Sequence, residues 1–182
     1  MASPISCLSI LIIPLLVTSL FYDVSNADRA FVEKVCKNSI DYDFCLSTLL
    51  SDPEGLTDVP YRLGLVATSV SLGMISKIND GEIGNILIKV TDPVVRTRIT
   101  DCQIDMSNLY KDMESARDHA GTQSYRAEAK SLASAQMKIV ECNNRFKSPP
   151  ASESPISSSI SKIEKLINIC AAVLNMIPPP PS

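Results

Sequence analysis

The sequence contains few side chains that could catalyse a reaction, and His119 is the first to consider. It is the single histidine in 182 residues, so a catalytic triad or a histidine-based metal site would have to be built around it. The spacings Cys-x-x-Cys, Gly-x-Ser-x-Gly and His-Glu-x-x-His do not occur in the sequence. His119 also stands two residues before Gly121, where a cation would complement the dipole at a helix C-terminus. We therefore expect no catalytic residue, no metal site and no cofactor.

Three aspartates suggest a second kind of chemistry, because glycosidases use a pair of carboxylates as acid and base. Asp101, Asp105 and Asp112 are separated by four and seven residues, which places them on one face of a single helix. Charged residues on one helix face usually point to solvent. We accordingly predict a solvated face here and not an active site.

The cysteines are the remaining reactive residues, and their use depends on the compartment. The uncharged run from Cys7 to Tyr22, followed by Ser25-Asn26-Ala27, predicts a signal peptide over residues 1–27. Pro14 and the lack of a basic residue before the run leave an uncleaved membrane anchor as the alternative. No later segment has the roughly 18 apolar residues needed to span a bilayer, so we expect a secreted mature chain.

A secreted chain would retain five of the six cysteines, enough for two disulfides and one free thiol. The loss of Asp23 with the leader leaves a net charge of −2. A chain so close to neutral gives no electrostatic reason to expect binding to nucleic acid.

The elements that position these residues are predicted to be helices. Apolar residues recur at three- and four-residue steps after the leader, which indicates an all-α fold without a sheet. Short helices near residues 29–37 and 42–51 would form a hairpin within residues 28–57. An antiparallel four-helix bundle would follow within residues 58–177, and a proline-rich tail over residues 178–182. The predicted N-caps are Asp58, Asp92 and Ser124, and the predicted stops are Asn79-Asp80-Gly81 and Gly121.

Helix lengths indicate which cysteines can meet. Cys102 precedes Gly121 by 19 residues and Cys142 follows it by 21. At about 1.5 Å per residue both lie about 30 Å from the turn, at one level of an antiparallel pair. Cys36 and Cys45 flank the polar turn of the short hairpin, so a bond between them would stabilise an element with little packing of its own.

Several short motifs then resemble a known family. CKNSIDYDFC, residues 36–45, resembles its first cysteine pair, with an aromatic residue before the second cysteine. Asp101-Cys102 resembles the Asp-Cys pair of its long helix. LASAQ, residues 132–136, followed by Cys142 and Phe146, resembles the small-residue run and C-x-x-x-F ending of its next helix. On these motifs the mature chain resembles the plant invertase and pectin methylesterase inhibitors.

This resemblance implies a four-helix bundle after a helical hairpin, disulfides Cys36–Cys45 and Cys102–Cys142, a free Cys170, and no catalytic activity. It also implies a one-to-one complex with a cell-wall enzyme, either a pectin methylesterase or an acid invertase. We expect the free protein to be a monomer.

Two departures from the family pattern bear on the choice of partner. Invertase inhibitors carry a Pro-Lys-Phe triplet between the bridged helices, and the matching residues here are Gln123, Ser124 and Tyr125. Only the aromatic residue is kept, so we place pectin methylesterase ahead of invertase and treat these three residues as the partner-binding loop. Met106 replaces a family tyrosine, a change that a core tolerates. His119, beside the loop, would then tune binding with pH as an alternative to its helix-end role.

Two other functions are kept as alternatives. One is a non-inhibitory, allergen-like protein with the same fold. The other is a bundle that binds an apolar ligand, although plant lipid-transfer proteins usually carry eight cysteines with an adjacent pair.

Overall fold

The computed structural model describes residues 28–177. The predicted signal peptide, residues 1–27, and the proline-rich tail, residues 178–182, lie outside the described residues. None of the helices within residues 28–177 has the length and apolar character that crossing a membrane requires.

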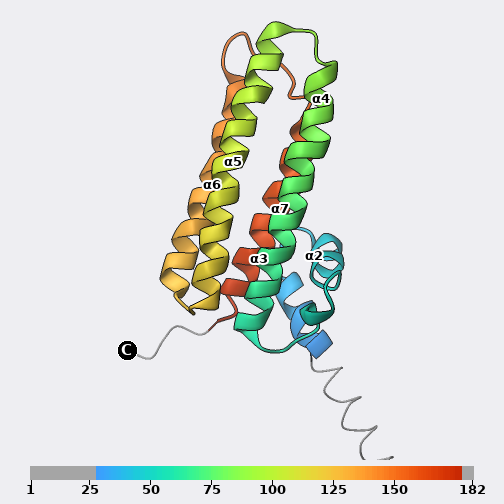
Figure 1. Cartoon of the computed structure of the whole chain (residues 1–182). Helices are drawn as coiled ribbons and strands as arrows, with labels where there is room; N and C mark the ends of the chain where they lie inside the picture. The colour runs from blue at the N-terminus through green and yellow to red at the C-terminus, as the bar shows by residue number, and fades with distance from the viewer. Residues whose placement is uncertain (1–27, 178–182) are drawn as a thin grey trace, which may run out of the picture.

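The described chain is helical, which confirms the predicted all-α class. A first helix covers residues 28–36. The elements after it, shown in Figure 1, are α2 (Tyr42–Leu49), the 3-10 turn η1 (Pro53–Gly55), α3 (Pro60–Ser76), the π-helix η2 (Lys77–Ile83), α4 (Gly84–Lys89), α5 (Pro93–Gly121), α6 (Tyr125–Lys147) and α7 (Ser157–Leu174).

The long helices form an up-down-up-down bundle (Figure 1). Helix α5 packs between α3 and α6, and α7 closes the ring between α6 and α3. Because each helix has two long neighbours, each buries one stripe of side chains and leaves its outer face exposed. The core includes the fully buried Ile75, Met106, Met113, Ile139 and Ile163.

Aspartate caps explain where several helices begin. Asp41 accepts a hydrogen bond from the Phe44 amide at the start of α2, and Asp92 accepts from Val94 and Val95 before Pro93 opens α5. The prediction that Asp58 is an N-cap is wrong, because Val59 occupies the cap position of α3. Ser124 does stand at the N-cap position of α6, as predicted, although its side chain makes no capping hydrogen bond within residues 28–177.

The predicted stop at Asn79-Asp80-Gly81 is also wrong. The chain continues through this sequence as the π-helix η2 and directly into α4. A π-helix accommodates extra residues in a wider turn without breaking the helix axis. The buried Ile78 and Ile83 anchor this segment on both sides of the glycine, so packing outweighs the turn preference of Asn-Asp-Gly.

The N-terminal hairpin is attached to α7 by polar contacts as well as by its own disulfide. Cys36 and Cys45 are bonded, with Cα atoms 5.5 Å apart. Asn168 of α7 accepts the Ile40 amide at 2.8 Å, and Lys165 pairs with Asp41 at 2.7 Å. The hydrogen bond from Lys165 lowers the pKa of Asp41, so the capping carboxylate also ties α2 to the bundle.

Candidate functional site

The α5–α6 pair is the most strongly braced part of the fold. Cys102 and Cys142 are bonded, with Cα atoms 4.9 Å apart, and both are fully buried. The bond lies within the core and fixes how two long helices lie against each other.

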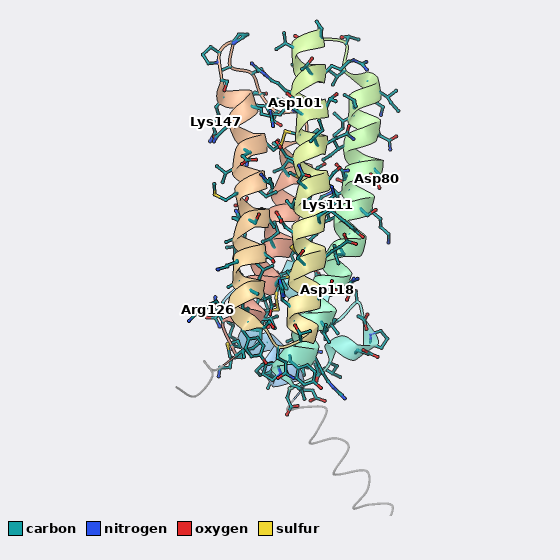
Figure 2. All side chains as sticks on the ribbon, turned by 60° about the vertical axis from the view of Figure 1, so that its left-hand side comes forward. Asp80, Asp101, Lys111, Asp118, Arg126 and Lys147 are labelled. Carbon is teal, nitrogen blue, oxygen red and sulfur yellow. A yellow bond between two sulfur atoms is a disulfide. The ribbon has the colours of Figure 1, made fainter. Side chains whose placement is uncertain are left out.

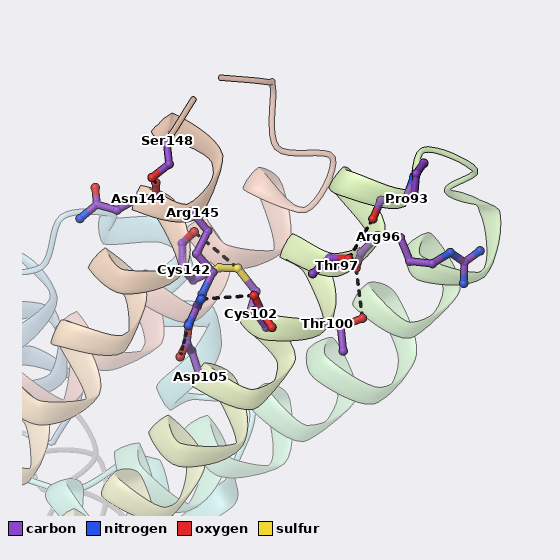
Figure 3. A network of polar contacts seen from close by, with 11 residues as sticks. Pro93, Arg96, Thr97, Thr100, Cys102, Asp105, Cys142, Asn144, Arg145 and Ser148 are labelled. Carbon is purple, nitrogen blue, oxygen red and sulfur yellow. Dashed lines mark hydrogen bonds and ion pairs between the residues drawn. A yellow bond between two sulfur atoms is a disulfide. The ribbon is translucent and has the colours of Figure 1, made fainter. Parts of the chain in front are cut away.

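An ion pair between the partly exposed Arg145 and the buried Asp105 lies beside this disulfide, as Figure 3 shows. Arg145 donates to both oxygens of Asp105, at 2.8 and 3.0 Å, and to Asp101 at 3.4 Å. Hydrogen bonding to Asp105 raises the pKa of Arg145. The side chain of Asp105 is only 7% exposed, and a forked arginine-carboxylate contact fixes both partners in one geometry.

The prediction of a solvated aspartate face is therefore wrong. Asp101, Asp105 and Asp112 do share one face of α5, but that face lies against α6. Asp112 accepts a hydrogen bond from Ser134 of α6 at 2.7 Å. The carboxylates are matched by donors across the helix pair, so they act as structural contacts and form no acid and base pair.

At the other end of the pair, the turn between α5 and α6 holds the predicted partner-binding residues. The Ser124 amide donates to the His119 carbonyl at 2.8 Å, and the Gln123 amide donates to the Ala120 carbonyl at 3.1 Å. These two bonds make a Schellman motif. Gln123 occupies its left-handed position with φ 53°, where glycine is usual, and Gly121 does not have positive φ.

This turn brings Gln123, Ser124 and Tyr125 together at one end of the bundle. Gln123 and Ser124 are exposed, Tyr125 is half-buried, and the Tyr125 hydroxyl donates to Gln123 Oε1 at 3.4 Å. A surface depression of about 650 Å³ follows these residues along the first turn of α6, past Arg126 and Lys130. Figure 2 shows Arg126 at this end of the molecule.

His119 lies in the last turn of α5, where it was expected. Its carbonyl accepts the Ser124 amide and the Thr122 hydroxyl, at 2.8 and 3.2 Å. The residue is thus joined through its backbone to the turn that carries the predicted loop.

A buried carboxyl lies directly behind this turn. Glu128, in the first turn of α6, is 1% exposed, and its Oε2 atom has no hydrogen-bond partner in the described part of the chain. Burial raises its pKa to about 7. The Glu128 amide donates to the Ser124 carbonyl at 3.0 Å, so this residue connects the loop to the interior. Sequence patterning did not identify it, although a glutamate in phase with Leu132 and Ala135 was a visible signal.

The free thiol of Cys170 lies in the interior of the same bundle. It is 1% exposed, and its sulfur lies 3.6 Å from the Ser71 hydroxyl. Burial raises its pKa to about 12, which makes the thiol a weak nucleophile. Cys170 therefore packs as a small core residue.

The α5–α6 pair exposes three large apolar side chains that sequence reasoning missed. Ile104 is 57% exposed, Met137 57% and Val140 44%. Val140 is exposed because the buried positions of α6 beside it are Ile139 and Cys142. Ile104 and Val140 each stand two residues, or about 200° of helix rotation, from a bridged cysteine. They therefore point away from the disulfide on opposite sides of the pair and are separate exposed side chains.

Comparison with known proteins identifies the family. A sequence model described as plant invertase/pectin methylesterase inhibitor matches residues 30–173. Proteins named putative invertase inhibitor from Platanus acerifolia and Platanus orientalis are 28% and 27% identical over 154 residues. These alignments cover 80% of this chain and 82% and 86% of the relatives.

Solved structures share the fold. The crystal structure of mutant form A of a pectin methylesterase inhibitor from Arabidopsis aligns with a TM-score of 0.66 at 16% identity. The alignment covers 81% of this chain and 97% of that one. A second pectin methylesterase inhibitor, from Arabidopsis thaliana, aligns with a TM-score of 0.57 at 15% identity, over 81% and 95% of the two chains. With its family motifs, its helical bundle and this match over most of its length, the chain belongs to the plant invertase/pectin methylesterase inhibitor family.

Proposed function

We propose that this chain is a secreted protein inhibitor that forms a one-to-one complex with a plant cell-wall enzyme and covers its substrate cleft. The α5–α6 pair is the observation that carries the proposal. The disulfide and the Arg145–Asp105 contact brace one end of this pair, and the Schellman turn orders the other. A surface that is already ordered loses little conformational entropy on binding.

Pectin methylesterase is the first candidate for the target. The Gln123-Ser124-Tyr125 turn lacks the Pro-Lys-Phe triplet that the family resemblance associates with invertase inhibitors. Acid invertase is the second candidate, since the two Platanus relatives carry that function in their names.

Two surfaces of the α5–α6 pair would contact the enzyme. The turn supplies Tyr125, an aromatic residue of the type that anchors interfaces. The exposed Ile104 supplies apolar area on α5 to exclude water. Both surfaces belong to one braced unit, so one rigid body would present both to the enzyme.

The proposal is tested by titrating the purified secreted protein against purified pectin methylesterase and acid invertase at mildly acidic and neutral pH. We expect stoichiometric inhibition of one enzyme. Ile104→Ser should weaken inhibition by about tenfold or more, as expected for loss of an apolar contact at an interface. The matched control is Ile88→Ser, because Ile88 is 77% exposed on α4. Equal inhibition by both variants would remove Ile104 from the interface, and a lack of inhibition of either enzyme would favour the non-inhibitory bundle.

A further inference from the structure

A second polar site lies on the opposite flank of α5, where it faces α3 and the π-helix. A cleft of about 280 Å³ opens there, with Ile75 and Met106 buried at its floor and the half-buried Tyr110 beside them. Figure 2 shows Asp80 and Lys111 near the middle of the bundle, well away from the α5–α6 turn marked by Asp118 and Arg126. The cleft is therefore separate from the predicted partner-binding loop.

The π-helix places an unpaired acceptor in the wall of this cleft. Asn79 Oδ1 is buried and has no hydrogen-bond partner among residues 28–177, while the Asn79 Nδ2 donates to Asp80 at 3.2 Å. Ser76 donates to the other Asp80 oxygen at 3.1 Å. An unpaired buried oxygen destabilises the free protein, and π-helical turns occur frequently at functional sites. An N–H donor that reached this oxygen from the cleft would satisfy it.

The cleft offers many more acceptors than donors. Glu114 is half-buried and has no ion-pair partner within residues 28–177. The Ser107 hydroxyl already donates to the Gln103 carbonyl at 2.9 Å, so it presents lone pairs. The available donors are the Tyr110 hydroxyl and the exposed Lys111 ammonium group. This excess selects a ligand rich in N–H donors and positively charged, and it disfavours an acidic sugar.

We propose that the cleft receives the guanidinium group of an arginine side chain from the partner enzyme, an inference that rests on the proposed function. A guanidinium carries five N–H donors in a planar fork, enough for Asn79 Oδ1 and the Asp80 and Glu114 carboxylates together. Its apolar stem fits against Met106, and its plane can stack on Tyr110. The volume is slightly below the roughly 300–1,000 Å³ of small-molecule sites, which suits a single side chain.

The first test needs no enzyme. N-acetyl-L-arginine amide is titrated into the isotopically labelled secreted protein and followed by NMR. We expect saturable shifts at the Asn79 side-chain amide and at Tyr110, with a dissociation constant on the order of 10 mM or tighter. The neutral citrulline analogue should bind at least about tenfold more weakly, because it lacks the charge. Absence of saturable shifts overturns the proposal. Equal binding of the lysine amide or of a neutral monosaccharide overturns it as well.

The second test uses variants and separates this proposal from the proposed function. Glu114→Gln should raise the dissociation constant of the arginine probe and the inhibition constant by about tenfold or more, as expected for loss of one charge-assisted contact. Asp118→Asn removes an exposed acid from the same helix outside the cleft and should change neither value. If the protein inhibits but Glu114→Gln inhibits normally, the arginine proposal fails and the inhibitor function stands. If no enzyme is inhibited, the proposed function fails, and with it the assignment of the arginine to an enzyme.

Discussion

Replacing Glu128 by glutamine should remove the main pH dependence of stability between mildly acidic and neutral pH. Glu128 is 1% exposed, its Oε2 has no hydrogen-bond partner within residues 28–177, and burial raises its pKa from 4.5 to about 7. Across the helix interface, the charge of Glu128 contributes to raising the pKa of the Cys170 thiol, itself buried on α7. At about 1.36 kcal/mol per pKa unit, ionisation of Glu128 costs the folded state about 3 kcal/mol.

The direction of the change in stability with pH follows from proton linkage. The folded protein holds the Glu128 proton more tightly than the unfolded chain does, so this contribution is fully favourable below pH 4.5 and is lost as the pH rises through 7. Asp41 and Glu82 act in the opposite sense, because hydrogen bonds from Lys165 and Lys162 lower their pKa values. Their contributions to the free energy of unfolding are lost only as the pH falls below their ordinary pKa values. Above pH 4.5, the change in stability with pH therefore comes mainly from Glu128.

The assay is urea unfolding at intervals between about pH 5 and 8, followed by circular dichroism, with the free energy extrapolated to water. The free energy of unfolding of the wild-type protein should fall by about 2–3 kcal/mol across this range, and that of Glu128→Gln should change little. Glu153→Gln, in the exposed loop before α7, is the matched control and should behave as wild type. Repeating both unfolding series with the additional substitution His119→Asn removes the single histidine from the comparison. A wild-type stability that is unchanged or rises between pH 5 and 8 would refute the assignment.

Three further changes test the bracing of the fold. Replacing Cys102 and Cys142 together by serine should lower the free energy of unfolding by about 4 kcal/mol, since the bond closes a long loop, and chemical denaturation would measure it. Gln123→Gly should raise the melting temperature slightly, by relief of about 0.5–1 kcal/mol at the left-handed position; no gain would show that the turn is unstrained. Gly55→Ala should destabilise the protein by about 2 kcal/mol or more, because a Cβ would lie 1.8 Å from the Leu49 carbonyl oxygen, and a wild-type melting curve would contradict this.

Much of the fold could be predicted from the sequence because helix length and helix position are local properties. Apolar periodicity and the Asp92-Pro93 cap are sufficient to place α5. Counting residues on each side of the turn is sufficient to place Cys102 opposite Cys142, since every helical residue advances by the same 1.5 Å. The four-helix class and its antiparallel order follow from the same kind of reasoning.

The rotation of each helix about its own axis was decided by the tertiary structure. Asp105 is buried because α6 lies against that face of α5 and supplies Arg145. Val140 is exposed because Ile139 and Cys142 take the inward positions of α6. Spacing along one helix shows which residues share a face, but the neighbouring helix determines whether that face meets protein or solvent.

The candidate sites depend on the same distinction. The sequence alone placed Gln123, Ser124 and Tyr125 in a turn beside His119, because turn residues interrupt two long helical patterns. The left-handed conformation of Gln123 and the cleft beside Asn79 emerged only from the packed structure. A π-helix forms when packing on both sides of a turn sequence favours continuing the helix, and such long-range packing energies have no signature in a local stretch of sequence.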